Sequence, residues 1–295
     1  MYNGIINVHK EAGFTSHDVV AKLRGILKQK KIGHTGTLDP NATGVLPVCL
    51  GNGTKLCDML TDKSKEYETV MLLGIATDTE DISGTVIDET EVNVTDKQVK
   101  EVIESFLGEY SQIPPMYSAL KVNGQKLCDL ARKGVVIERT PRPVVIHEIE
   151  ILEMQLPRVK MRIHCSKGTY IRSLCRDVGD KLGCGACMEE LKRTRVGIFE
   201  TDNSYTLKQI EKLVNEGRIE EIITGTEYLF DYPKLVLCEQ DDYLVKNGNM
   251  FRSKDYPKIE DLCKVYLSNG IFAGIYGYDE ESGFYKPKKM FLSGK

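Results

Sequence analysis

The segment GHTGTLDPNATG, residues 33–44, holds one carboxylate, one imidazole and three glycines within twelve residues. A carboxylate such as Asp39 can act as a nucleophile or a base, and a histidine such as His34 can exchange protons near neutral pH. An Asp-Pro pair is also a common turn, because aspartate bonds its own backbone and proline fixes φ. Residue types alone therefore leave open whether the segment is a site, and they favour a plain loop.

Two other uses of glycine-rich sequence can be weighed from spacing. A phosphate-binding P-loop needs Lys-Ser or Lys-Thr after its last glycine, whereas Gly44 is followed by Val45. TDTEDISG, residues 77–84, resembles a calcium loop, but Ile82 occupies a position that needs an oxygen ligand. We expect a strand-ending turn there and no phosphate loop in residues 33–44.

Nine cysteines are scattered between Cys49 and Cys263, an odd number that suits reduced thiols better than a disulfide framework. The close pair Cys184 and Cys187 lacks the second pair that a four-ligand zinc site requires. The sequence therefore predicts free thiols and no bound metal.

A chain of 295 residues predicts about two domains, because single hydrophobic cores usually stop growing near ~250 residues. An apolar fraction of 41% and a charged fraction of 28% are ordinary for a globular protein. No stretch reaches the ~18 apolar residues of a membrane span, and the first residues lack the order of an export signal. We therefore expect a cytoplasmic protein without a membrane segment.

The net charge of −3 at pH 7 argues against a uniformly basic nucleic-acid binder. Basic residues nevertheless cluster, and phosphate contact depends on the local potential. The clusters are Lys22, Arg24, Lys28, Lys30 and Lys31, the segment from Lys121 to Arg142, and Lys192, Arg193 and Arg195. On composition alone, RNA contact and an ordinary solvated surface are equally good explanations.

Several elements must position these residues, and apolar periodicity predicts them. The expected strands before residue 170 are GIINVHK, VLPVCLG, KEYETVMLLGIAT, VVIHEIEILEM and VKMRIHCS. Three expected helices follow capping residues, namely Thr15 or Ser16, Thr95 with Gln98, and Thr206 with Gln209. We expect Gly108 to end the second of these helices.

A fourth helix is predicted from Tyr170 to Leu182, with Gly183 as its end, so that a strand leads into a helix across SKGTYIR. The chain becomes irregular after the third capped helix, and we place a domain boundary near residue 232. The remaining residues contain short strand candidates such as KVYLSNG and IFAGIYGY. They predict a small β barrel.

Four segments together resemble a known family: GHTGTLDPNATGVLPVCLGNGTK, DKSKEYE, IPPMYSALKVNGQKL with LARKG, and SKGTYIRSLCRDVGDKLGCGA. In this order, over about residues 4–200, they look like the TruB family of pseudouridine synthases, which isomerise a uridine in the T loop of tRNA. The motifs are long and specific. The resemblance implies that residues 33–44 form a site.

By this resemblance, Asp39 matches the family's catalytic aspartate, and Arg172 matches the arginine that pairs with it. A carboxylate can attack C1′ of the sugar or add to the base, and the sequence does not distinguish these routes. A neighbouring guanidinium favours an ionised carboxylate by lowering its pKa and by pairing bidentately. We therefore expect such a pair, with a lowered pKa at Asp39.

The resemblance implies substrate contacts for four further residues. Tyr67 matches the tyrosine that stacks on the target base and is proposed to move a proton, while Tyr170 and Leu191 match positions around the flipped base. His34 matches the histidine that stacks on the T-loop bases. From local sequence alone, Tyr67, Tyr170 and Leu191 would be core or helix-start residues.

Residues 113–142 resemble the insertion that closes over the T loop, where basic side chains could meet phosphates. These side chains are Lys121, Lys126, Lys133, Arg132 and Arg139. The chain departs from the family's pattern at Glu11, where proline commonly follows the lysine, and at Cys128, where tyrosine is frequent. Neither residue is the proposed nucleophile.

The resemblance implies an α+β protein. Residues 1–231 would form a pseudouridine synthase domain with a mixed central β-sheet flanked by helices, and residues 232–295 a small PUA-type, β-barrel-like RNA-binding domain. The implied activity is conversion of tRNA uridine 55 to pseudouridine, which needs no cofactor because isomerisation consumes neither redox equivalents nor nucleotides. We expect a monomer that binds tRNA and requires no protein partner. The alternatives are a guide-RNA-dependent synthase of the same superfamily and a tRNA-binding folding factor.

Overall fold

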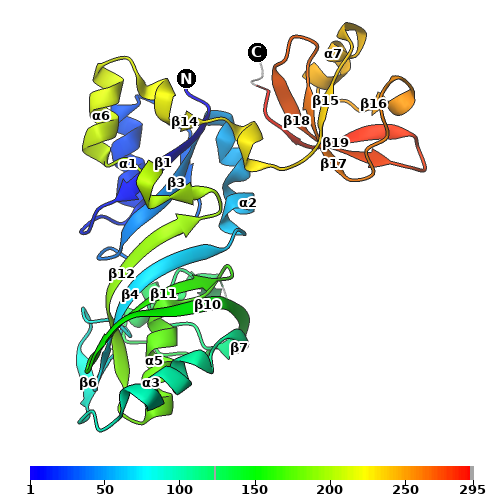
Figure 1. Ribbon diagram of the computed structural model, residues 1–295. Helices are drawn as coiled ribbons and strands as arrows, with labels where there is room; N and C mark the ends of the chain where they lie inside the picture. The colour runs from blue at the N-terminus through cyan, green and yellow to red at the C-terminus, as the bar shows by residue number, and fades with distance from the viewer. Residues whose placement is uncertain (123, 293–295) are drawn as a thin grey trace.

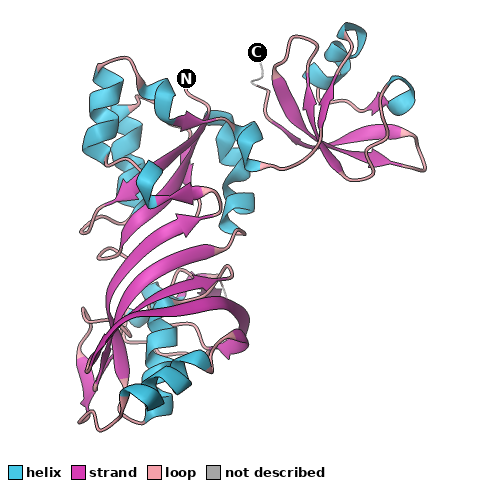
Figure 2. Cartoon of the chain, viewed as in Figure 1, coloured by secondary structure: helices cyan, strands magenta, loops and turns pink. Residues whose placement is uncertain are grey.

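The computed structural model describes residues 1–122 and 124–292. Two main β-sheets, of ten and five strands, organise the chain. The large sheet runs through an elongated body, and a linker joins this body to a smaller C-terminal lobe (Figure 1, Figure 2). No helix within the described ranges is long and apolar enough to cross a membrane.

The large sheet is mixed, which confirms the predicted fold class. Along its main path the strands are β14 (Ile223–Thr224), β1 (Gly4–Lys10), β3 (Thr43–Leu50), β12 (Ala186–Val196), β4 (Lys65–Leu73), β11 (Arg158–Cys165), β10 (Arg142–Gln155) and β7 (Gly108–Gln112). Two further strands pair beside this path, β2 (Ile32–His34) with β3 and β13 (Phe199–Glu200) with β12.

The sheet divides where β3 meets β12. These two strands run parallel and pair only through Lys192 with Thr43 and Arg193 with Gly44. Gly44 has a φ of +102°, and a Cβ there would lie 2.2 Å from the Arg193 carbonyl oxygen. Only glycine permits this approach, so the glycine that ends the segment 33–44 brings its loop against β12.

Helices cover each half of the sheet with a separate core. α1 (Ser16–Ile26) and α6 (Leu207–Asn215) pack with β1 and β3, whereas α3 (Asp96–Glu104) and α5 (Ile171–Leu182) pack with β4, β10, β11 and β12 (Figure 1). The shorter elements of the body are β5 (Ile75–Thr77), β6 (Val86–Glu89), β8 (Lys121–Val122), β9 (Gln125–Lys126), α2 (Cys57–Thr61), α4 (Leu127–Ala131), η1 (Gly51–Leu56), η2 (Thr201–Asn203), η3 (Ile219–Ile222) and η4 (Thr226–Leu229).

The three predicted helix starts are confirmed. Thr15, Thr95 and Thr206 each accept a hydrogen bond from the backbone N–H three residues later, and the residue there bonds back. Gly183, with a φ of +77°, ends α5 as expected. α3, however, stops at Glu104 rather than near Gly108. The Ser105 hydroxyl donates to the Val102 carbonyl at 2.6 Å, and the chain then turns.

Two other predictions about elements are wrong or incomplete. Residues 65–77 do not form one strand, because Gly74, at a φ of +87°, separates β4 from β5. β12 was not predicted, although it lies at the centre of the sheet. The register of β12 against β4 shifts after Met188 and after Arg193. These irregularities interrupt the alternation of apolar and polar residues by which a strand is recognised in a sequence.

The C-terminal lobe is the expected small β domain, in the form of a curled, open five-stranded sheet. Its order is β15 (Lys234–Val236), β17 (Leu262–Tyr266), β18 (Phe272–Asp279), β19 (Phe284–Met290) and β16 (Phe251–Arg252), with α7 (Glu239–Lys246) and η5 (Ser253–Asp255) between strands. α7 was not predicted. The lobe joins the body through a shared apolar cluster in which Phe291 and Ile275 lie with Leu56, Leu229 and Phe230.

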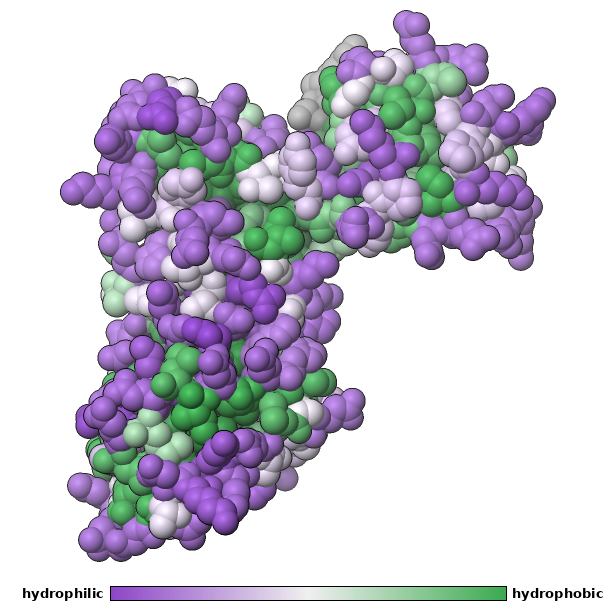
Figure 3. Space-filling model, viewed as in Figure 1, coloured by the Kyte–Doolittle hydropathy of each residue, from purple (hydrophilic) through white to green (hydrophobic). Residues whose placement is uncertain are grey.

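Figure 3 shows that hydrophilic residues cover most of the visible face of both parts. Apolar residues gather near the linker and over the lower part of the body. Between these two regions, around the middle of the large sheet, the visible surface is mainly hydrophilic (Figure 1, Figure 3).

Candidate active site

The segment 33–44 is a loop between β2 and β3, and two buried cations hold it by its carbonyl groups. Lys10, at the end of β1, donates from Nζ to the Pro40 oxygen at 2.9 Å and to the Ala42 oxygen at 2.6 Å. Arg193, from β12, donates to the Gly36 oxygen at 3.3 Å and to the first residues of β3. These contacts fix the loop on both sides of Asp39.

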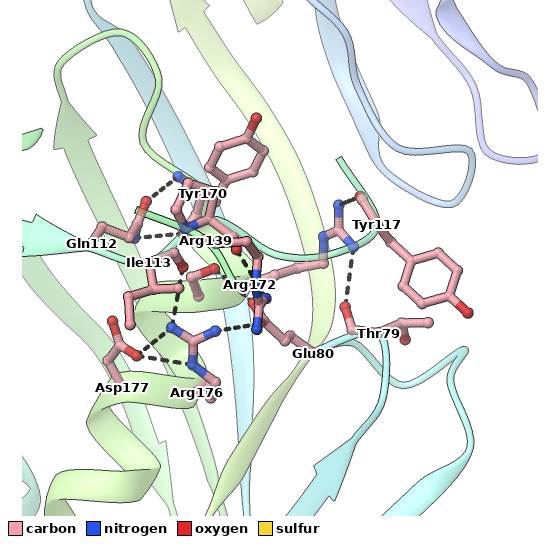
Figure 4. Close-up of polar contacts among 12 residues, drawn as sticks. Thr79, Glu80, Gln112, Ile113, Tyr117, Arg139, Tyr170, Arg172, Arg176 and Asp177 are labelled. Atoms are coloured by element: carbon pink, nitrogen blue, oxygen red, sulfur yellow. Dashed lines mark hydrogen bonds and ion pairs between the residues drawn. The ribbon is translucent and has the colours of Figure 1, made fainter. Parts of the chain in front are cut away.

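Arg172 comes from the first turn of α5 and forms a bidentate ion pair with Asp39. Nε lies 3.0 Å from Asp39 Oδ2, and Nη2 donates to Asp39 Oδ1 at 3.1 Å. The guanidinium also donates to the Thr79 oxygen at 3.1 Å and the Tyr117 oxygen at 2.8 Å (Figure 4). Asp81 Oδ2 lies 3.5 Å from Nη1. Arg172 is therefore held from four directions, and the predicted pair is present.

The pair lies at a cavity of about 810 Å³. Asp39 and Arg172 line it together with Leu191, Asp81 and Tyr117. The Arg172 side chain is only 5% exposed, whereas 34% of the Asp39 side chain is accessible. The carboxylate therefore faces the cavity while its cation is enclosed by protein, as in sites that bind a small molecule or a single extruded base.

The net pKa shift of Asp39 is upward, whereas the sequence predicted a lowered pKa. Burial raises the pKa of the carboxyl above its ordinary value of 3.8, and Arg172 and Lys10 only partly offset this rise. The Asp81 carboxylate raises the pKa of Asp39 further. Arg172 acts in the predicted direction, but desolvation and a second carboxylate outweigh it.

Tyr67 lies on β4 beneath this site. It is 8% exposed and belongs to the core cluster that includes Leu38 of the loop. Its hydroxyl is hydrogen-bonded to Arg193. Burial raises the pKa of Tyr67, and the Asp39 charge raises it further, while Arg193 opposes both effects. The phenol is therefore neutral at pH 7 and in the electrostatic field of Asp39.

Among the described residues that line the cavity, His34, Tyr67 and Tyr170 do not occur. His34 ends β2, and its Nδ1 accepts a hydrogen bond from the Gly36 N–H at 3.3 Å. Burial, together with Arg193, lowers the pKa of His34, which makes the ring neutral at pH 7. The structure thus brings Asp39, Arg172 and Leu191 to one cavity and leaves His34 outside its lining.

Tyr170 is the N-cap residue of α5, directly before the turn that carries Arg172. The Gln112 side-chain amide bonds both its backbone N–H, at 2.8 Å, and its carbonyl, at 3.0 Å (Figure 4). Burial raises the pKa of the Tyr170 hydroxyl. Gln112 thereby fixes the start of α5 against the edge strand β7.

The basic clusters have different environments. Arg193 is fully buried, and Arg195 Nη2 lies 3.4 Å from Glu66. In the insertion, Arg139 donates to the Pro114 oxygen at 3.0 Å, and Arg132 lines the cavity 3.5 Å from Asp129. Lys121, Lys126, Arg132 and Lys133 are exposed, whereas Arg139 is half-buried.

Residue types did not identify Lys10, Asp81 or Arg193 as parts of the site. One signal was available for Lys10, which ends an otherwise apolar strand. A lysine buried there must find hydrogen-bond acceptors, and these are carbonyls of the loop 33–44. Asp81 lies in the turn 77–84, which is a turn as expected but also contacts Arg172. All nine cysteines are free, and no group of three potential metal ligands exists among residues 1–122 and 124–292.

Two solved structures share this fold over most of the chain. The "Crystal Structure of a Cbf5-Nop10-Gar1 Complex" matches with a TM-score of 0.74 and 28% identity over 98% of this chain and 85% of that chain. The "Structure of H/ACA RNP bound to a substrate RNA containing 2'-deoxyuridine" matches with a TM-score of 0.72, 26% identity and the same shares. The family model that matches residues 24–171 defines the class of this fold as pseudouridylate synthase.

Sequence comparisons narrow the class to a family. Residues 24–171 match the model "TruB family pseudouridylate synthase (N terminal domain)", and residues 172–231 match "tRNA pseudouridylate synthase B C-terminal domain". The protein named tRNA pseudouridine synthase B in Lachnoclostridium phytofermentans is 54% identical over 98% of this chain and 100% of its own. That of Clostridium tetani is 46% identical over 96% and 97%. The chain belongs to the TruB family of pseudouridylate synthases.

Proposed function

We propose that this chain is a stand-alone enzyme that converts uridine 55 in the T loop of tRNA to pseudouridine, with Asp39 as its catalytic residue. The bidentate Asp39–Arg172 pair at the cavity is the observation that carries the proposal. It presents one oriented carboxylate to a space that can take an extruded nucleotide. The relatives named for activity on tRNA match the chain over almost its whole length.

The reaction sets simple requirements for the site. The bond from C1′ to N1 of the uracil breaks, a bond from C1′ to C5 forms, the C5 proton leaves, and N1 gains a proton. Atoms and electrons balance within the nucleotide, so no cofactor is required. An ionised Asp39 can attack C1′ or the base in this sequence. Arg172 keeps the carboxylate ionised against the cost of burial and fixes its direction.

The other site residues have separate roles in the proposal. Leu191 lines the cavity and supports the flipped base by apolar contact. Tyr67 lies outside the cavity lining of the free chain, and in the proposal it stacks on the base and transfers the C5 proton once RNA is bound. Tyr170, which also lies outside the lining of the free chain, contacts the flipped base from the start of α5 when RNA is bound, and His34 stacks on the T-loop bases that the uridine leaves.

The insertion is suited to close over the RNA. It begins after Gln112 and ends at Arg142, and these two residues are direct partners on adjacent antiparallel strands. Both ends of the segment are therefore anchored at one edge of the sheet. Its exposed Lys121, Lys126 and Lys133 would contact phosphates. We assign residues 1–231 to the catalytic domain, with this insertion at 113–142, and residues 232–295 to a PUA-like RNA-binding domain.

A guide-RNA-dependent synthase is the second candidate, because the solved structures described above are an H/ACA RNP and a complex with Nop10 and Gar1. The 54% and 46% identity to proteins named for tRNA favours the stand-alone form. We propose a monomer that acts in the cytoplasm, where tRNA is its substrate, and that needs no protein partner.

Tritium release from tRNA that carries 5-tritiated uridine tests the function, because the C5 proton must leave. The purified chain, assayed without guide RNA or added protein, should release one tritium from each tRNA. A tRNA in which uridine 55 is replaced by cytidine should release none. If the chain binds tRNA but releases nothing, it is a binding or folding factor instead. If release depends on added guide RNA, the stand-alone assignment is wrong.

Lys10 provides a test of the loop. The Lys10→Met variant should lose about tenfold in kcat, because the Pro40 and Ala42 carbonyls lose their donor and the Asp39 loop shifts. Burial lowers the pKa of Lys10 to about 8, so wild-type activity should fall as pH rises through about 8 and the amine loses its donating charge. The variant should lack this alkaline limb.

Tritium release measured from neutral to alkaline pH checks both statements. Lys65 is a matched comparison, because burial lowers its pKa to about 8 as well and it donates only to the Thr61 and Lys63 carbonyls. A limb that persists in Lys10→Met and disappears in Lys65→Met would contradict the assignment to Lys10.

A further inference from the structure

Arg176 lies one helical turn after Arg172 on α5 and bonds two segments that are far apart in sequence. Its Nη1 is paired with Glu80 Oε1, and its Nη2 donates to the Ile113 carbonyl at 3.2 Å (Figure 4). Asp177 accepts from Nε at 2.9 Å and from Nη2 at 2.6 Å. The Arg176 guanidinium therefore binds Glu80, Asp177 and Ile113 at the same time, which its planar set of N–H donors allows.

Glu80 belongs to the turn that holds Arg172. The neighbouring residues of this turn provide the Thr79 carbonyl and the Asp81 carboxylate to the Arg172 guanidinium. Glu80 is buried and has a φ of +63°, an uncommon conformation for a residue with a side chain. Its second oxygen accepts from the Ser173 hydroxyl at 2.6 Å. Interactions with α5 therefore hold the turn in a conformation that its own backbone disfavours.

Ile113 is the first residue of the insertion. Gln112 before it is bound to the backbone of Tyr170, and Pro114 after it accepts from Arg139 at the far end of the insertion. The first turns of α5 therefore contact the root of the insertion, residues 112–114, on one side and the turn 77–84 on the other. Figure 4 shows Arg176 between Ile113 and Glu80, with Arg172 beside it.

We propose that Arg176 is a positioning residue that ties the root of the insertion to the turn that orients Arg172, so that RNA bound by the insertion aligns the Asp39–Arg172 pair. This inference rests on the proposed function. Arg176 does not touch the cavity lining, and it acts only through Glu80 and Ile113. Arg172 also binds the insertion directly, through the Tyr117 carbonyl. A displacement of the insertion root therefore reaches Arg172 by a second route, through Arg176, Glu80 and the backbone of the turn that contains Glu80.

The charges around Arg176 stabilise its contacts with the turn that contains Glu80. Burial alone would lower the pKa of Arg176, but Glu80 and Asp177 raise it, so the guanidinium stays charged. The groups that face it are Glu80 from the turn, Asp177 and the more distant Asp180 from α5, and the carbonyl of Ile113. Without the cation, the Glu80 carboxylate would be buried with only the Ser173 hydroxyl as partner.

The test begins with Arg176→Lys, which keeps the charge near Glu80 but cannot reach Glu80, Asp177 and Ile113 together. We expect kcat for tritium release to fall about 10- to 100-fold, with the Kd for tRNA unchanged, because the pair is misaligned after binding. Arg218→Lys is the control for the substitution itself, since Arg218 also makes a bidentate pair, with Glu221, and does not line the cavity. This control should retain wild-type kcat.

A charge-balanced variant separates positioning from folding. Arg176→Gln leaves Glu80 without a cation and is expected to unfold the turn, whereas Glu80→Gln with Arg176→Gln removes both charges together. We expect the double variant to melt near the wild-type temperature and to lose kcat as much as Arg176→Lys. A wild-type kcat in either folded variant would overturn the inference, and so would a loss confined to KM. If the wild-type chain releases no tritium, the proposed function fails instead.

Discussion

Asp39→Asn should reduce tritium release by at least about 10⁴-fold while tRNA binding persists. The amide keeps the size of the carboxylate but cannot act as a nucleophile or a base. Binding should persist because the exposed lysines of the insertion and the C-terminal lobe are untouched. A filter-binding measurement beside the tritium assay gives both quantities. Residual release within tenfold of wild type would show that Asp39 is not the catalytic residue.

The same variant should be at least as stable as the wild type at pH 7. Burial raises the folded-state pKa of Asp39 above its ordinary value of 3.8, so the folded chain binds this proton more tightly than the unfolded chain. The resulting stabilisation is complete below the unfolded pKa and is lost as pH rises through the folded pKa. At pH 7 the ionised carboxylate is therefore a cost that Asn removes, and the buried Arg172 keeps Asp81 and the Thr79 and Tyr117 carbonyls as partners. Thermal melting would reveal the opposite sign if the tight pair stabilises the fold.

Arg172→Met should lower both activity and stability. Asp39 and Asp81 would lose their shared cation, and the Thr79 and Tyr117 carbonyls would lose their donor. Because this pair is largely enclosed, we expect a loss of about 3 kcal/mol in the free energy of unfolding. Activity should fall by about 10²- to 10³-fold, since the carboxylate is no longer held ionised or oriented.

The pH profile distinguishes these two effects of Arg172. Arg172 lowers the pKa of Asp39, so its removal should raise that pKa further and move the acid limb of tritium release to higher pH. Arg172→Lys should restore the position of the limb by its charge, but not the full rate, because an ammonium cannot pair bidentately. An acid limb that stays at the same pH in Arg172→Met would contradict the electrostatic role.

Features that depend on neighbouring residues could be predicted from the sequence. Three threonine caps with their partners three residues later set three helix starts, and Gly183 set the end of α5. Such signals work because a cap satisfies backbone groups within one turn of the chain. The end of α3 was predicted late because the backbone tightens after Glu104 into turns with bonds three residues apart, which continue until Gly108 at a φ of +89°.

The motifs around Asp39 and Arg172 indicated the family. Through that resemblance they also predicted that these two residues form a pair. Composition and periodicity could not provide this assignment, because an Asp-Pro turn and a helix-start arginine are ordinary features. The Asp39–Arg172 contact joins residues 133 positions apart, and only resemblance indicated it. The spatial relation of Leu191 to this pair follows from β12, a strand that its irregular register concealed.

The sequence by itself determined the residue types, the local caps and the long motifs that mark a TruB family member. The tertiary structure decided the direction of the Asp39 pKa shift, because desolvation depends on everything that surrounds a group. It also decided that Lys10 and Arg193 hold the loop by carbonyls, and that Glu80 and Ile113 share Arg176. Backbone acceptors carry no residue identity, so no sequence pattern can reveal such partners.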